Sequence, residues 1–229
     1  EAVGPVTIDN MTLTATTGWT ITGWSYDATN DTVSHSAGTT AMKTTNPVLT
    51  ADDVGKNFHI KMMIANPAGP DADDIWTPCT VGDVTIACGG RSWEVGVGKA
   101  YPFRSMSYTF TFDVESVTGD DAYIEITPSN DFAGHVDGIL LRQAPDYGSL
   151  TIDNDNGSGR CRITASKGGF RMDLWIKGVR SHLFNKDDMI CISNSENVSD
   201  TYSWDGIYTI QSVTDTVMEI TPIPEFGGD

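Results

Sequence analysis

SYTFTFDVESVTGDDAYIEITPSNDFAG, residues 107–134, is the stretch that decides the expected fold. In both halves of it, apolar side chains alternate with polar ones: Tyr108, Phe110, Phe112 and Val114 in the first half, Ile124 and Ile126 in the second. A period of two is typical of a strand that buries one face, and Gly with Asp favours a tight turn. The stretch therefore predicts two strands that form a hairpin around a turn at 118–121.

The same punctuation recurs near the end of the chain. The segment 210–214 reads IQSVT and 218–222 reads MEITP, and Phe226 lies four residues past Pro222, as Phe132 lies four past Pro128. We expect each copy to end one all-β domain. The prediction is two domains, residues 1–146 and 147–229, joined by a linker at 144–148.

The composition also favours an all-β protein. The 229 residues are 39% hydrophobic, and β-branched and aromatic residues are separated at short intervals by Gly, Asp, Asn and Ser. No window carries a helical apolar stripe, and no run approaches the roughly eighteen apolar residues of a membrane-spanning helix. The first residues, EAVGPVTID, lack the basic and apolar regions of a targeting signal. We expect no membrane partner.

The chain is strongly acidic, with 31 Asp and Glu against 14 Lys and Arg and a net charge of −17. Such a charge repels nucleic acid and anionic lipid, and the basic residues are scattered along the chain. We therefore expect no nucleic-acid partner. We expect the acidic side chains to form a solvated surface, or else to be complemented by a basic partner surface or bound cations.

Four cysteines divide evenly between the two expected domains. Cys79 and Cys88 flank TVGDVTIA, where a hairpin at Gly82 would bring the sulfurs together, and Cys161 and Cys191 lie in separate strand-like runs. Each pair is a possible disulfide. The alternative is buried free thiols, as a reducing cytosol would favour.

The sequence shows no signature of catalysis, metal binding or a cofactor. It has no nucleophile elbow, no zinc-protease motif and no phosphate loop, and its cysteines lack the short spacing of a zinc site. We predict no catalytic residues, no metal and no cofactor, hence no enzyme. A glycosidase pair of carboxylates stays open, because such a pair forms in space and not in sequence.

Several aromatic residues are candidates for contacts. Trp76, Trp93 and Tyr101 are the expected ligand-binding residues, because flat exposed rings stack on sugars; packing in a core or at a subunit interface is the alternative. In a continuous strand Trp19 and Trp24 would face opposite sides.

A short helical turn is also expected, because Thr50 is followed three residues later by Asp53, the pattern of a capped helix start.

Part of the chain resembles a known family of domains. GWTITGW at 18–24, TIACGG at 85–90 and YIEITPSNDFAGHVDGILL at 123–141 are similar to the jelly-roll domains, themselves similar to carbohydrate-binding modules, of tailed-bacteriophage virion proteins. Residues 184–221 resemble a small β module of phage structural proteins. The resemblance implies a jelly-roll β-sandwich followed by a smaller antiparallel β-sheet or β-barrel.

The resemblance also implies a function. We expect a non-enzymatic virion protein that decorates the capsid exterior, bound to the major capsid protein or other virion proteins and forming a homo-oligomer. The alternative is a tail-fibre, receptor-binding or carbohydrate-binding module whose partner is a host glycan.

Overall fold

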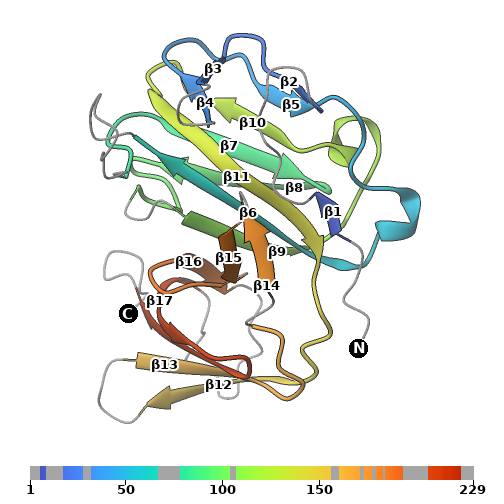
Figure 1. Cartoon of the computed structure of the whole chain (residues 1–229), viewed down its shortest axis with the longest axis vertical. Helices are drawn as coiled ribbons and strands as arrows, with labels where there is room; N and C mark the ends of the chain where they lie inside the picture. The colour runs from blue at the N-terminus through green and yellow to red at the C-terminus, as the bar shows by residue number, and fades with distance from the viewer. Residues whose placement is uncertain are drawn as a thin grey trace. The chain divides into compact units, whose positions relative to one another are not determined.

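A computed structural model of the chain describes residues 6–8, 18–27, 32–66, 78–103, 107–155, 160–170, 173–176, 179–182, 184–192 and 206–222. The chain divides into two compact units: unit 1 is Glu1–Met106 with Thr111–Ala144, and unit 2 is Ser107–Phe110 with Pro145–Asp229 (Figure 1). In the described residues all regular structure is β apart from two short 3₁₀ helices, and no helix there is long and apolar enough to span a membrane.

Unit 1 is a β-sandwich of two sheets, as its alternating strands predict. The first sheet contains, in spatial order, Thr111–Asp113 of β9 (Ser107–Asp113), then β6 (Asn57–Ala65), β11 (Gly134–Gln143), β4 (Thr32–His35) and β3 (Ser25–Asp27), with β1 (Val6–Ile8) paired to β11. The second contains β2 (Trp19–Thr20), β5 (Met42–Thr44), β10 (Glu125–Pro128), β7 (Asp83–Cys88) and β8 (Arg91–Gly96).

The core of unit 1 lies between these sheets. Every second residue of β7 and β10 is buried, and β6 buries Phe58, Ile60, Met62 and Ile64 on one face. Because side chains alternate across a strand, the residues between the buried ones of β7 and β10 point outward. This alternation leaves an accessible outer face on the second sheet.

The predicted hairpin of residues 107–134 is wrong, although both of its strands form. β9 pairs within the first sheet and β10 lies between β5 and β7 of the second, and the expected turn is the 3₁₀ helix η2 (Gly119–Ala122). The alternation identifies strands, but it does not say which strands pair. The segment crosses from one sheet to the other, and each of its two strands buries its apolar face in the core from its own sheet.

The segment that holds Trp19 and Trp24 makes a similar crossing. Instead of one strand, Ile21–Trp24 forms a turn closed by a hydrogen bond from the Trp24 N–H to the Ile21 carbonyl, with Gly23 at φ +81°. β2 then belongs to the second sheet and β3 to the first. As a result both indole rings are buried, at 4% and 6% exposure.

The predicted helical turn is confirmed as the 3₁₀ helix η1 (Ala51–Asp53). The Thr50 N–H and hydroxyl both donate to the Asp53 carboxylate, each at 2.9 Å. Partial burial acts against ionisation of Asp53, but these hydrogen bonds and the Lys56 ammonium hold its pKa below the ordinary value.

Unit 2 contains a smaller antiparallel sheet in the order β12 (Leu150–Asp155), β13 (Arg160–Ala165), β18 (Val217–Pro222), β17 (Gly206–Val213) and β16 (Met189–Ile192). Met189 of β16 lies opposite Tyr108 in a parallel pairing with the part of β9 that belongs to this unit. β14 (Asp173–Ile176) and β15 (Val179–His182) form a separate hairpin. The expected all-β fold class, a sandwich followed by a smaller sheet, is confirmed.

The structure departs from both possible disulfides. Cys79, Cys88 and Cys161 are buried free thiols, and the Cys191 side chain lies outside the described residues. A methyl group on Gly134 would come within 2.7 Å of the Cys79 sulfur, whereas Cys88 lies at the far end of β7. The strand between them spans roughly 17 Å, which no disulfide can bridge.

The second pair of cysteines is separated across the sheet of unit 2. β18 and β17 lie between the strand of Cys161 and the strand of Cys191. Three strand spacings amount to roughly 14 Å, again too far for a bridge. Burial raises the pKa of the Cys79 and Cys88 thiols to about 12, with the Asp121 charge adding to the effect at Cys88. Such thiols are unreactive at neutral pH.

Candidate functional site

The outer face of the second sheet of unit 1 is the candidate site. We call it the polar face, and it consists of the outward-pointing residues Lys43, Asp83, Thr85, Ala87, Ser92, Glu94, Tyr123, Glu125 and Thr127. All of them are half-buried or exposed, whereas the residues between them on β7 and β10 are buried. The face therefore joins hydroxyls, carboxylates, a lysine and one aromatic ring on a rigid sheet.

The strand register places these residues in rows across the sheet. Lys43 lies opposite Glu125, Glu125 opposite Ala87, and Ala87 opposite Ser92. In a second row, Thr127 lies opposite Thr85, which lies opposite Glu94. Neighbours in a row are about 4.8 Å apart from strand to strand. Lys43 and Glu125 thus lie next to each other on β5 and β10, Glu94 lies on the edge strand β8, and short side chains lie between them.

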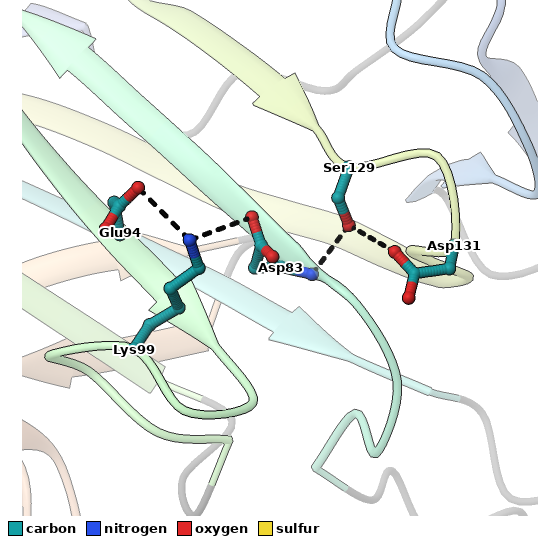
Figure 2. A network of polar contacts seen from close by, with 5 residues as sticks. All are labelled: Asp83, Glu94, Lys99, Ser129 and Asp131. Carbon is teal, nitrogen blue, oxygen red and sulfur yellow. Dashed lines mark hydrogen bonds and ion pairs between the residues drawn. The ribbon is translucent and has the colours of Figure 1, made fainter.

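A polar network forms one margin of the face, as Figure 2 shows. The Lys99 ammonium lies 3.2 Å from Glu94 Oε1 and 3.8 Å from Asp83 Oδ1. The Asp83 N–H donates to the Ser129 hydroxyl at 2.9 Å, and that hydroxyl donates to Asp131 at 2.8 Å. Lys99 thus holds two carboxylates of neighbouring strands, and Ser129 ties the start of β7 to the turn after β10.

Two glycines allow this arrangement. Gly82, at φ +72°, leads into β7, and a Cβ there would lie 2.4 Å from the Phe132 backbone nitrogen. Gly96 lies opposite Asp83, and a Cβ at Gly96 would come within 2.2 Å of the Asp83 Cβ. Any larger residue at either position would displace the start of β7, and with it Asp83.

Lys43, Asp120 and Tyr123 form the opposite margin. The Lys43 ammonium pairs with Asp120 and lies 4.3 Å from the centroid of the Tyr123 ring. The hydrogen bond to Asp120 raises the pKa of Lys43 above its ordinary value; burial opposes this, and the Asp120 and Glu125 charges support it. Lys43 is therefore a fixed cation beside the aromatic ring of the face.

These groups can donate and accept hydrogen bonds and can offer an aromatic surface to a ligand. Among the described residues, no three His, Cys, Asp or Glu side chains gather as a metal ion would require. The side chains suit reversible binding of a polar ligand, in which carboxylates accept hydrogen bonds from hydroxyls and an aromatic ring covers apolar C–H groups.

Two of the three predicted ligand-binding residues, Trp93 and Tyr101, lie outside the polar face. Trp93 is half-buried and points to the inner side of β8, where its ring meets Phe112 edge-on at a centroid distance of 5.1 Å. Tyr101 is only 6% exposed and forms an isolated β-bridge with Val95 of β8. Trp76 lies outside the described residues. Both described rings thus pack against unit 1, and their contact with a ligand stays a prediction.

The sequence contained part of the signal for the polar face. The alternation in DVTIAC, residues 83–88, and in EITP, residues 125–128, indicates which side chains share a strand face. It could not show that β7 and β10 pair, because about forty residues separate them. Tyr123 was missed because the adjacent Gly119–Ala122 segment was assigned to a hairpin turn.

Comparisons with known proteins concern the fold. No protein-family model matches the chain, and no curated protein matches it. The chain is similar to the solved CBM22-1 xylan-binding domain from Paenibacillus barcinonensis Xyn10C, with 14% identity and a TM-score of 0.33, over 62% of this chain and 97% of that one. It is also similar to the N-terminal CBM22-1-CBM22-2 tandem domain of the same protein, with 11% identity and a TM-score of 0.32, over 99% of this chain and 88% of that one.

Proposed function

We propose that unit 1 is a non-catalytic glycan-binding module that holds a neutral, extended oligosaccharide on its polar face. The observation that carries the proposal is that Glu125 and Thr127 of β10 point outward, while the Tyr123 ring, two residues before Glu125, lies beside the Lys43 ammonium of the same face. This arrangement sets an aromatic ring, a carboxylate and a hydroxyl in succession on a rigid sheet. Sugars offer the complementary groups, namely C–H faces and hydroxyls.

The charges favour a neutral ligand. The face holds Asp83, Glu94 and Glu125 against Lys43, and Lys99 lies at its margin, while the whole chain carries −17. An anionic glycan would be repelled by the whole chain as well as by these carboxylates. A neutral glycan avoids that repulsion and can still accept hydrogen bonds from the two lysines.

The position of Lys99 supports binding rather than hydrolysis. A glycosidase keeps the space between its two carboxylates free for the glycosidic bond and water. Here the Lys99 ammonium contacts both Glu94 and Asp83, at 3.2 and 3.8 Å, and so occupies that space. We therefore expect binding without release of reducing sugar.

The test is calorimetric titration of the full chain with soluble neutral oligosaccharides of glucose, xylose, mannose and N-acetylglucosamine. We expect at least one of them to bind, and Glu125→Ala and Tyr123→Ala each to weaken that binding about tenfold, the effect of losing one good polar or stacking contact. A parallel reducing-sugar assay is expected to stay at background.

The matched control is Asp52→Ala, which removes one exposed carboxylate of η1, outside the polar face. It changes the net charge as Glu125→Ala does and should leave affinity unchanged. The proposal fails if no oligosaccharide binds with a dissociation constant below about 1 mM. It also fails if Trp93→Ala abolishes binding in a folded protein while both polar-face variants bind normally.

A further inference from the structure

Strand β12 ends the sheet of unit 2. It pairs with β13 along its whole length, from Leu150 opposite Ala165 to Asp155 opposite Arg160, without a register shift. Among the described strands, β12 has no neighbour on its other side. The strand contains no Pro or Lys, the residues that commonly protect a sheet edge from further pairing. Its outer edge is thus a regular strand edge.

The apolar side of this sheet continues onto β12. Leu150 and Ile152 lie opposite Ala165 and Ile163, which are 2% and 8% exposed. Leu150 itself is 52% exposed, and Ile152 is half-buried. A further strand beside β12 would cover these two side chains and extend the apolar layer by one strand.

The other side of the sheet carries a row of alternating charge. Asp153 lies opposite Arg162, and Arg162 lies opposite Glu219, with Arg162 Nη2 at 3.5 Å from Glu219 Oε1. The row continues to Ser212, whose hydroxyl donates to Glu219 at 2.7 Å. At the edge the row ends on the exposed carboxylate of Asp153. A basic side chain on an added strand would continue the alternation.

We propose that the outer edge of β12 binds an extended segment of a partner protein by strand addition. A Lys or Arg of that segment lies opposite Asp153, and its alternate residues are aliphatic and lie beside Leu150 and Ile152. Backbone hydrogen bonds supply the affinity, and the two side-chain rows supply the selectivity. This site lies on unit 2 and is independent of the glycan proposal for unit 1.

A second copy of this chain fits the edge less well. β12 has no basic residue of its own, since it reads LTIDND. When two copies pair antiparallel with their apolar sides together, Asp153 meets Thr151 or another acidic residue of the second copy. The registers that oppose two acidic residues are disfavoured by charge repulsion, and the Thr151 register leaves Asp153 without a basic partner. The charge row thus favours a different, basic chain over self-association.

The test uses the full chain and a labelled, blocked peptide of alternating Val and Lys, with the matching Val and Glu peptide for comparison. Fluorescence anisotropy should show the Lys peptide binding at least about tenfold more tightly than the Glu peptide. Asp153→Lys should reverse that order. Hydrogen exchange should show that the Lys peptide protects the amides of residues 150–155.

Two controls separate strand addition from attraction to an acidic protein. Asp52→Lys makes the same charge change outside unit 2 and should not reverse the order. A Lys peptide of equal charge with a central proline should bind at least tenfold more weakly, because proline interrupts the strand. Equal binding of the proline peptide, unchanged preference in Asp153→Lys, or a dimer that protects β12 without any peptide would each overturn the proposal.

Discussion

At the scale of single residues, His59 shows how burial changes the chemistry of a group. Its imidazole is fully buried on β6, and its Nδ1 lies 2.7 Å from the Thr111 hydroxyl of the neighbouring strand β9. Burial first, and the charge of Arg142 second, lower the pKa of His59 from 6.5 to about 3. The folded protein therefore keeps His59 neutral at pH values at which the unfolded chain protonates it.

This shift predicts an acid-sensitive stability. Above the unfolded pKa of 6.5, both states hold His59 neutral and the full stability is present. As the pH falls from 6.5 towards 3, only the unfolded chain gains a proton, so His59 lowers the free energy of unfolding by up to about 1.4 kcal/mol per pH unit. Urea unfolding between pH 7 and pH 4 measures the slope.

The control is His59→Asn, which keeps a hydrogen-bonding group near Thr111 and does not titrate. Its stability should fall less steeply with acidity than that of the native chain, because proton uptake by His59 of the unfolded chain no longer contributes to the slope. Equal slopes for the two proteins would refute a neutral, buried His59.

At the scale of secondary structure, two kinds of contact join β8 of the second sheet to β9 of the first at one edge of the sandwich. Arg91 reaches Asp113 at 2.6 Å and Glu115 at 2.8 Å, and Trp93 packs edge-on against Phe112. Gly89 makes room for this closure, since a Cβ there would meet the Phe112 ring at 2.8 Å. The two strands belong to different sheets, so these contacts hold the sheets together at this edge.

The two contacts should differ in strength. The Arg91 ion pairs are exposed and hydrated, so Arg91→Ala should cost less than about 1 kcal/mol of unfolding free energy. Trp93→Ala removes a large, half-buried ring and should cost about 2–3 kcal/mol. Urea unfolding measures both, with Ser92→Ala on the exposed side of the same strand as the control. A larger loss from Arg91→Ala would contradict this ranking.

At the scale of the whole molecule, attachment to a virion stays a prediction from the sequence resemblance. A decoration protein binds the assembled shell and not free capsid subunits, so shell stability rises with occupancy by mass action. With a net charge of −17, the chain would bind a basic shell surface, and added salt would weaken that binding.

The measurement is the copy number and position of the chain on purified particles, by quantitative staining and electron cryo-microscopy. Decoration predicts many copies spread over the head and a shell that melts at a higher temperature with increasing occupancy. A few copies at the tail tip would refute decoration and support receptor binding, for which the polar face would supply the glycan contacts.

The sequence by itself determined the properties that depend on neighbouring residues. The period of two in DVTIAC identified a strand and its two faces, and Thr50 with Asp53 identified the capped turn η1. Both rest on backbone geometry within a few residues, where the choice of conformations is small.

Only the tertiary structure decided which strands meet. It placed β10 beside β7, and it placed β9 in the other sheet. This arrangement brings Tyr123, Glu125 and Thr85 onto one face and separates the cysteines. It also turned Trp93 inward against Phe112. Strand partners far apart in sequence are selected by the packing of the common core, and the local alternation is the same whichever partner is chosen.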